Sequence, residues 1–135
     1  MSTKRIKNET GYYHITARGN GKQIIFNDDE DFLCYLDLLD KYNINFNIEI
    51  LAYCLMSNHI HLLIYDPQFN MDKLFRKVHS MYSRSFNYKY ERTGNLFQGR
   101  FKSKGINDDR QLMASLRYIL LNPEEAGFCK ACDYK

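Results

Sequence analysis

Two neighbouring apolar segments of this 135-residue sequence are joined by a very short turn. Residues 46–56 and 58–65 are rich in Ile, Leu and Tyr, which favour strands, and only the turn Met56-Ser57-Asn58 connects them. Strands joined by so few residues can pair only antiparallel. We therefore expect an antiparallel sheet built around this hairpin.

The rest of the sequence alternates between strand and helix patterns. Strand patterns cover residues 12–18 and 95–103, and apolar residues at helical spacing follow the candidate caps Asn27 and Asn70. A third helix is expected from a cap at Asn107 or Asp108 to residue 121, before Pro123. This order predicts one domain over residues 1–135 of the α+β class. Its topology would be a ferredoxin-like βαββαβ, or split βαβ, antiparallel sheet with an additional C-terminal helix that carries Tyr118.

Composition excludes several other classes of protein. Hydrophobic residues make up 44% and charged residues 26% of the chain, values typical of globular proteins rather than disordered or fibrous ones. No apolar run reaches the length of a membrane span, and the first residues lack the apolar part of a signal peptide. Four cysteines are too few for a disulfide scaffold. We expect a cytoplasmic protein with free thiols, and no zinc site at the lone pair Cys129 and Cys132.

Charge is unevenly distributed along the chain. The net charge is +3, but residues 71–105 carry a local charge of +7 and residues 27–49 a local charge of −6. The acidic block fits the first turn of a helix, where carboxylates are favoured. The basic block fits either a solvated face or a surface for phosphate backbones.

The second strand of the hairpin offers a candidate metal site. Side chains alternate between the two faces of a strand, so Ile60 and Leu62 share one face and His59 and His61 share the other. Two neutral imidazoles can bind one divalent cation, which can polarise a phosphoryl oxygen. Two histidines that simply lie on the sheet surface are the alternative.

The third helix offers a candidate nucleophile. At about 100° per residue, Tyr118 falls on a polar stripe away from the apolar side of the helix, and Asn122 follows one turn later. A tyrosine beside a metal-bound phosphodiester can attack phosphorus, and an asparagine oxygen can serve as a third ligand. Among eleven tyrosines, an ordinary surface residue is the alternative.

Four segments, in order, resemble motifs of single-tyrosine HUH transposases, and best those of the REP-associated branch. The segments are YHITARGN (13–20), AYCLMSNHIHLL (52–63), GNLFQGRFKS (94–103) and RYILLNP (117–123). The resemblance implies a metal-dependent endonuclease and strand transferase that acts on single-stranded hairpin DNA. It makes His59 and His61 the metal pair for Mg²⁺ or Mn²⁺, Asn122 a further ligand, and Tyr118 the nucleophile. The expected products are a 5′-phosphotyrosine and a free 3′-OH.

The resemblance also changes the interpretation of the basic block, from a solvated face to a DNA contact. We expect DNA to bind Arg18, Lys73, Arg76, Lys77, Arg84, Arg100, Lys102 and Lys104. A homodimer is expected. His14 and His79 are interpreted as ordinary strand and helix residues, although His14, beside Arg18, can approach DNA. Many relatives continue past residue 135 with a Trp-Ser-Ser-like segment, so a C-terminal piece can be missing here.

Three other functions remain open at this point. A non-catalytic nucleic-acid-binding module can have the same kind of sheet, but no segment matches its usual strand signature. A replication or conjugation initiator of the wider HUH group is disfavoured by the short chain and by the order of His59 and Tyr118. A host-adopted transposase that cuts hairpins without moving an element fits the sequence equally well.

Overall fold

The computed structural model describes residues 7–120 and the backbone of residues 128–131. The elements, in chain order, are β1 (Tyr12–Arg18), the short 3₁₀ helix η1 (Asn20–Lys22), α1 (Asp29–Asn43), β2 (Glu49–Leu55), β3 (His59–Tyr65), α2 (Met71–Lys89), β4 (Lys102–Gly105), α3 (Asp109–Leu120) and β5 (Phe128–Ala131). All strand pairs are antiparallel, in the order β4-β1-β3-β2-β5. The fold is therefore the expected α+β ferredoxin-like arrangement, with one more strand at the β2 edge.

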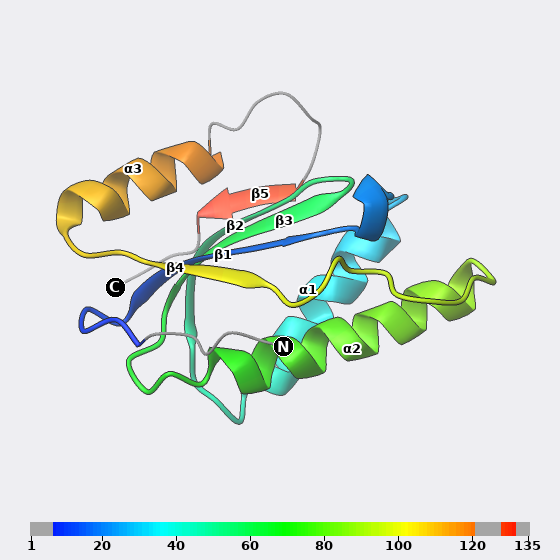
Figure 1. Ribbon diagram of the computed structural model, residues 1–135, viewed down its shortest axis with the longest axis horizontal. Coiled ribbons are helices and arrows are strands. Elements are labelled where there is room, and N and C mark those ends of the chain that lie inside the picture. Colours follow the sequence, from blue (N-terminus) through cyan, green and yellow to red (C-terminus); the bar gives the residue numbers. More distant parts are fainter. Residues whose placement is uncertain (1–6, 121–127, 132–135) are drawn as a thin grey trace.

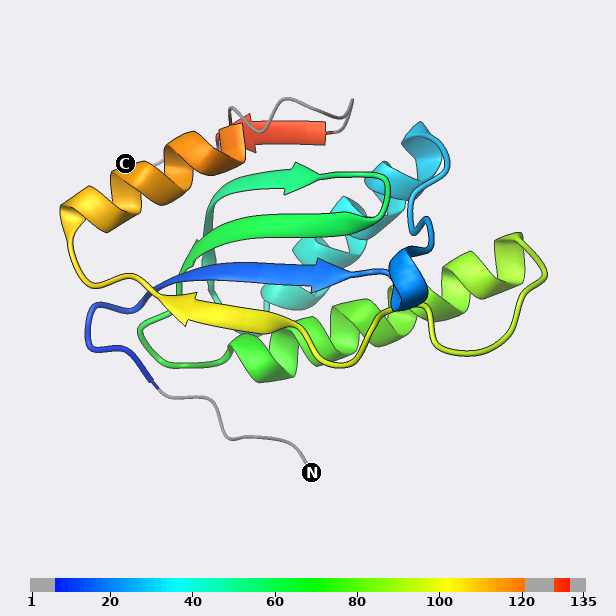
Figure 2. The ribbon, with the colours of Figure 1, turned by 45° about the horizontal axis from the view of Figure 1, so that its top comes forward.

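Helices cover both faces of this sheet. Helices α1 and α2 lie side by side on one face, and α3 lies over the other face (Figures 1 and 2). The alternation of β3 explains this division, because Ile60, Leu62 and Ile64 are completely buried in the core beneath α1 and α2. Leu63, from the opposite face of β3, belongs to a smaller cluster with Ile119 of α3. Hydrophobic side chains thus hold two separate layers against one sheet.

The fourth strand differs from its predicted range of residues 95–103. It begins only at Lys102, and residues 95–101 form an irregular segment that pairs with the sheet at a single bridge between Phe97 and Gly19. The physical reason is Gly99, whose φ of 64° lies in the left-handed region that an extended strand cannot use. As expected, β4 is an edge strand.

The expectation of four free thiols is wrong for Cys54. This residue is disulfide-bonded, and the pairing of β2 with β5 sets it directly opposite Cys129 in the backbone register. The sequence pattern did not reveal β5, so the approach of two cysteines on neighbouring strands was not foreseen. Cys34 is a free cysteine, as expected, and Cys132 lies outside the described residues.

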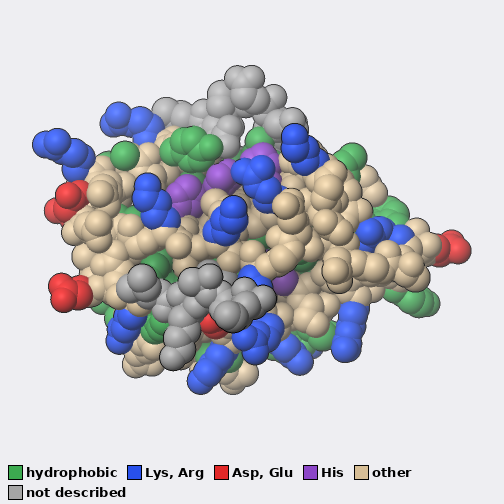
Figure 3. All heavy atoms as spheres, in the orientation of Figure 1, with side chains coloured by type: hydrophobic (Ala, Val, Ile, Leu, Met, Phe, Trp, Pro, Cys, Tyr) green, Lys and Arg blue, Asp and Glu red, His purple; other side chains and the backbone are tan. Residues whose placement is uncertain are grey.

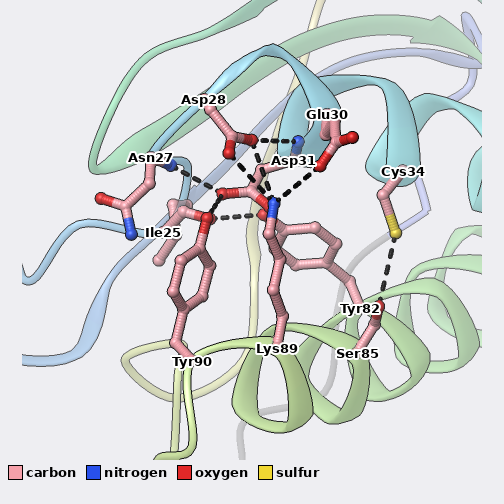
Figure 4. Close-up of polar contacts among 10 residues, drawn as sticks. All are labelled: Ile25, Asn27, Asp28, Glu30, Asp31, Cys34, Tyr82, Ser85, Lys89 and Tyr90. Carbon is pink, nitrogen blue, oxygen red and sulfur yellow. Dashed lines mark hydrogen bonds and ion pairs between the residues drawn. The ribbon is translucent and has the colours of Figure 1, made fainter.

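One residue of the basic block, Lys89, forms ion pairs within the protein. The Nζ atom of Lys89, at the end of α2, lies 3.1 Å from Asp28, 3.3 Å from Glu30 and 3.0 Å from Asp31 in the first turn of α1 (Figure 4). These carboxylates, Asp31 first, raise the pKa of Lys89. The hydroxyl of Tyr90 also donates to Asp31, over 2.7 Å. The acidic and basic blocks of the sequence thus meet here and fasten α1 to α2.

Within residues 7–120 and 128–131, no helix combines the length and apolar character needed to cross a membrane.

Candidate active site

His59 and His61 lie together on the face of the sheet that α3 covers. Their ring centroids are 5.0 Å apart and their planes are nearly perpendicular. His61 is 8% exposed, and His59 is half-buried. Figure 3 shows histidine side chains reaching the surface in a band, with Lys and Arg side chains around it. The structure therefore brings the two predicted histidines together as the alternation of β3 requires.

The Nδ1 atom of each histidine has a polar partner. Nδ1 of His59 lies 2.8 Å from Oδ1 of Asn58, and because a carbonyl oxygen only accepts, this nitrogen donates. Nδ1 of His61 lies 3.1 Å from Nε2 of His14, which projects from β1. With its hydrogen on Nδ1, His59 carries its lone pair on Nε2, which is the tautomer that can bind a metal through Nε2.

Burial favours the uncharged form of His61 and of its neighbour His14. The pKa of His61 is lowered to about 4, first by burial and then by His14, His59 and Arg18. The pKa of His14 is also lowered, first by burial and then by Lys104. At neutral pH both rings are therefore in the neutral form that binds metals.

Helix α3 places Tyr118 beside the histidines. Asp108, directly before the helix, caps it: its carboxylate accepts from the backbone N–H of Gln111 over 2.8 Å. Ile119 is buried against the sheet, so Tyr118 falls at the border between sheet and solvent and is 56% exposed. Its ring centroid lies 5.4 Å from that of His61 and 6.1 Å from that of His14. Asn122, the other residue predicted on this helix face, lies outside the described residues.

The two histidine rings can supply some, but not all, of the ligands of a divalent cation. Two neutral imidazoles are suitable nitrogen donors. The residues that the structure describes contain no group of three or more His, Cys, Asp and Glu side chains able to hold a metal. The remaining positions would thus be left to an amide oxygen, to water or to a phosphate oxygen of a substrate.

The comparison with protein families decides what kind of protein carries this site. The family model described as "Transposase IS200 like" matches residues 7–121, which is most of the chain and includes all three residues His59, His61 and Tyr118. The chain belongs to the IS200-like transposases. It is therefore a member of a family of DNA-processing enzymes.

Solved structures of other transposases share the fold. A REP-associated tyrosine transposase bound to a REP hairpin superposes with a TM-score of 0.72 at 17% identity, over 91% of this chain and 72% of the other. A protein described as "a putative transposase from Deinococcus radiodurans R1" gives a TM-score of 0.55 at 18% identity, over 93% of this chain and all of the other. No curated protein matches the sequence.

In this IS200-like transposase the eight predicted DNA-binding residues are all exposed, but they form two groups. Arg18, Lys102 and Lys104 flank the candidate site: the register pairs Arg18 with His59, Lys104 with His14, and Lys102 with Thr16. Because directly paired residues project from the same face, all three belong to the histidine face.

The second group consists of Lys73, Arg76, Lys77 and Arg84 on α2, behind the sheet, and of Arg100, which lines a hollow with Arg76. Arg84 lines a hollow of about 450 Å³ between α2 and residues 94–99. Arg76 and Arg100 line a smaller hollow of about 180 Å³ next to it. Arg100 is also ion-paired with Asp72 over 2.9 Å. The basic block of the sequence is thus not one continuous patch on the histidine face.

His14 is the site residue that sequence reasoning missed. It was interpreted as an ordinary strand residue, but its ring contacts His61 and packs near Tyr118. The sequence did show that His14 lies an even number of residues from Arg18 in the same strand, so that the two side chains share a face of the sheet. That pattern alone could not place His14 beside His61, because this also requires knowing which strands are neighbours in the sheet.

Proposed function

We propose that this IS200-like transposase cleaves single-stranded hairpin DNA through Tyr118 and then transfers the strand. The observation that supports the proposal best is the position of the Tyr118 ring against His61, since a nucleophile must lie beside the group that holds the phosphate. The hairpin carried by the REP-associated relative of the same fold supports the choice of substrate.

His59 and His61 would hold a divalent cation, Mg²⁺ or Mn²⁺, through their Nε2 atoms, with Asn122 as a further ligand. IS200-like transposases are in general metal-dependent. When bound, the cation would withdraw charge from the scissile phosphate and favour attack on phosphorus.

The covalent step is a transesterification at phosphorus. The phenol oxygen of Tyr118 forms a bond to phosphorus while the bond from phosphorus to the 3′ oxygen breaks. The phenol proton leaves to water, to which the exposed ring has access, and the 3′ oxygen takes up a proton to become a free 3′-OH. Attack by a 3′-OH on the phosphotyrosine reverses these events, joins the new strand and restores Tyr118.

Basic side chains would guide the DNA to this point. Lys102, Lys104 and Arg18 are suited to phosphates next to the scissile bond, since their strands flank the histidines. Arg100 and Arg76, which line one hollow at the same sheet edge, would continue the path around β4 toward α2. A DNA stem that follows this edge would contact both basic groups. A homodimer remains a prediction.

The test is formation of a covalent protein–DNA adduct. The protein is incubated with end-labelled hairpin DNA and Mn²⁺ or Mg²⁺, and the products are separated on a denaturing gel. We expect an adduct with the wild type and none with Tyr118→Phe, because phenylalanine lacks the attacking oxygen.

Tyr88→Phe is the matched control, since Tyr88 is 89% exposed but lies on α2, behind the sheet. It should form the adduct normally. An adduct that persists in Tyr118→Phe would refute the assignment of the nucleophile. Tyr53 and Tyr82, the other tyrosines considered from the sequence, belong to the core beneath α1 and α2. Binding of hairpin DNA without any adduct in the wild type would favour the non-catalytic module instead. A host-adopted endonuclease would form the adduct but would not join a second strand.

A further inference from the structure

The contact between His14 and His61 constrains where hydrogens lie in the site. Nε2 of His14 and Nδ1 of His61 are 3.1 Å apart, within hydrogen-bond distance. The two residues are diagonal neighbours, since His14 pairs with Leu63 and Thr16 pairs with His61 in the β1–β3 register. The contact is therefore built into the sheet.

A neutral imidazole carries one N–H, and two lone pairs do not attract each other, so this contact allows only two arrangements. If His14 donates, the hydrogen of His61 lies on Nε2, and that nitrogen has no lone pair for a metal. If His61 donates from Nδ1, its Nε2 lone pair is free, and His14 carries its own hydrogen on Nδ1. Only the second arrangement gives His61 the same tautomer that Asn58 imposes on His59.

We propose that His14 is a positioning residue that accepts the Nδ1 hydrogen of His61 and thereby fixes His61 in the metal-binding tautomer. The inference rests on the proposed function of His59 and His61 as metal ligands. His14 is not a third ligand, because its Nε2 is occupied by His61. His14 would hold the ring of His61 as Asn58 holds that of His59.

The first test observes the tautomer directly, in the metal-free protein and without DNA. Long-range ¹H–¹⁵N spectra at neutral pH distinguish a protonated from an unprotonated ring nitrogen. We expect His61 to be protonated on Nδ1 in the wild type. In His14→Phe, which keeps a ring but removes the acceptor, His61 should move to the Nε2-protonated form. Protonation on Nε2 in the wild type would overturn the proposal.

The second test measures affinity for Mn²⁺ alone, by titration of the full chain. His14→Phe should weaken Mn²⁺ binding by about 10-fold to 100-fold, the usual effect of losing a partner of a metal-ligating histidine. His14→Gln, whose amide oxygen can accept the same hydrogen, should retain most of the affinity and the Nδ1-protonated tautomer. Equal affinity in all three proteins, or equal loss in both variants, would overturn the proposal.

These outcomes are separable from those of the proposed function. The spectra report on His61 whether or not DNA is cleaved, so an Nδ1-protonated His61 in a protein that forms no adduct would leave the positioning role standing and refute the nuclease. An Nε2-protonated His61 in a protein that forms the adduct would do the reverse.

Discussion

Asp66 is the residue on which the start of α2 depends. Its side chain is 1% exposed, and its carboxylate accepts from the backbone N–H of Asn70 over 2.9 Å and of Met71 over 2.7 Å. These donors lie at the start of a helix, which leaves its first four N–H groups without partners inside the helix. Asn70, the cap expected from the sequence, makes no side-chain hydrogen bond to the helix.

Replacing Asp66 by alanine should therefore lower the free energy of unfolding by about 3 kcal/mol. Met71 is fully buried, and a buried N–H that loses its acceptor costs about 1–3 kcal/mol. Loss of a negative charge at a helix N-terminus adds about 1 kcal/mol. The N–H of Asn70 is only half-buried, so water can replace the carboxylate there at little cost. The corresponding fall in Tm is about 10 °C.

The measurement is urea unfolding followed by far-UV circular dichroism, with the midpoint and the m-value fitted together. Asn70→Ala is the matched control, and it should change the free energy of unfolding by less than about 0.5 kcal/mol. Asp66→Asn keeps one acceptor oxygen and should fall between the two. If Asn70→Ala is as destabilising as Asp66→Ala, the assignment of the cap to Asp66 is wrong.

Two further predictions concern charge. Replacing Lys102 and Lys104 together by alanine should reduce the slope of log K against log salt, where K is the binding constant for hairpin DNA, by up to about 2, since each phosphate contact contributes about 0.9. The control Lys41→Ala, on α1, should leave this slope unchanged. An unaltered slope in the double variant would show that β4 does not contact the DNA. The pKa of His61 is lowered to about 4, chiefly by burial, and burial lowers the pKa of His79 to about 3. As the pH falls below 6.5, the unfolded chain therefore binds protons before the folded protein does. The free energy of unfolding should thus decrease from pH 7 to pH 5, by up to about 2 kcal/mol for each histidine. Urea unfolding at both pH values measures this change. Equal free energies of unfolding at the two pH values would contradict the prediction.

Much of the fold follows from local patterns. The alternation of residues 59–65 fixes which side chains of β3 face the core, and the spacing of apolar residues from 71 to 86 fixes the buried side of α2. The cap of α2 was assigned to Asn70 because it directly precedes the helix, whereas Asp66 reaches it across Pro67 from the end of β3. The last strand, β5, follows Pro123 as a run of only four residues, too short to reveal a strand by its own alternation.

The candidate site was predictable only in part. His59 and His61 share a face because they are two residues apart, and the helical period turned Tyr118 away from the apolar side of α3. His14 joins them through pairing between strands far apart in sequence, which period alone cannot show. The ion pairs of Lys89 could not be predicted from the sequence pattern either, since its carboxylate partners lie about sixty residues earlier in the chain (Figure 4).

The two parts of the candidate site depend mainly on different clusters of buried side chains. The histidines belong to a strand whose other face is locked into the main core, whereas Ile119 is the only fully buried side chain described in the helix that carries the tyrosine. Truncating Ile119 should therefore loosen the packing of α3 on the sheet, and with it the contact between Tyr118 and His61, while the core beneath α1 and α2 stays intact. Under the proposed function, such a protein would still bind DNA and the cation but would form less of the covalent adduct.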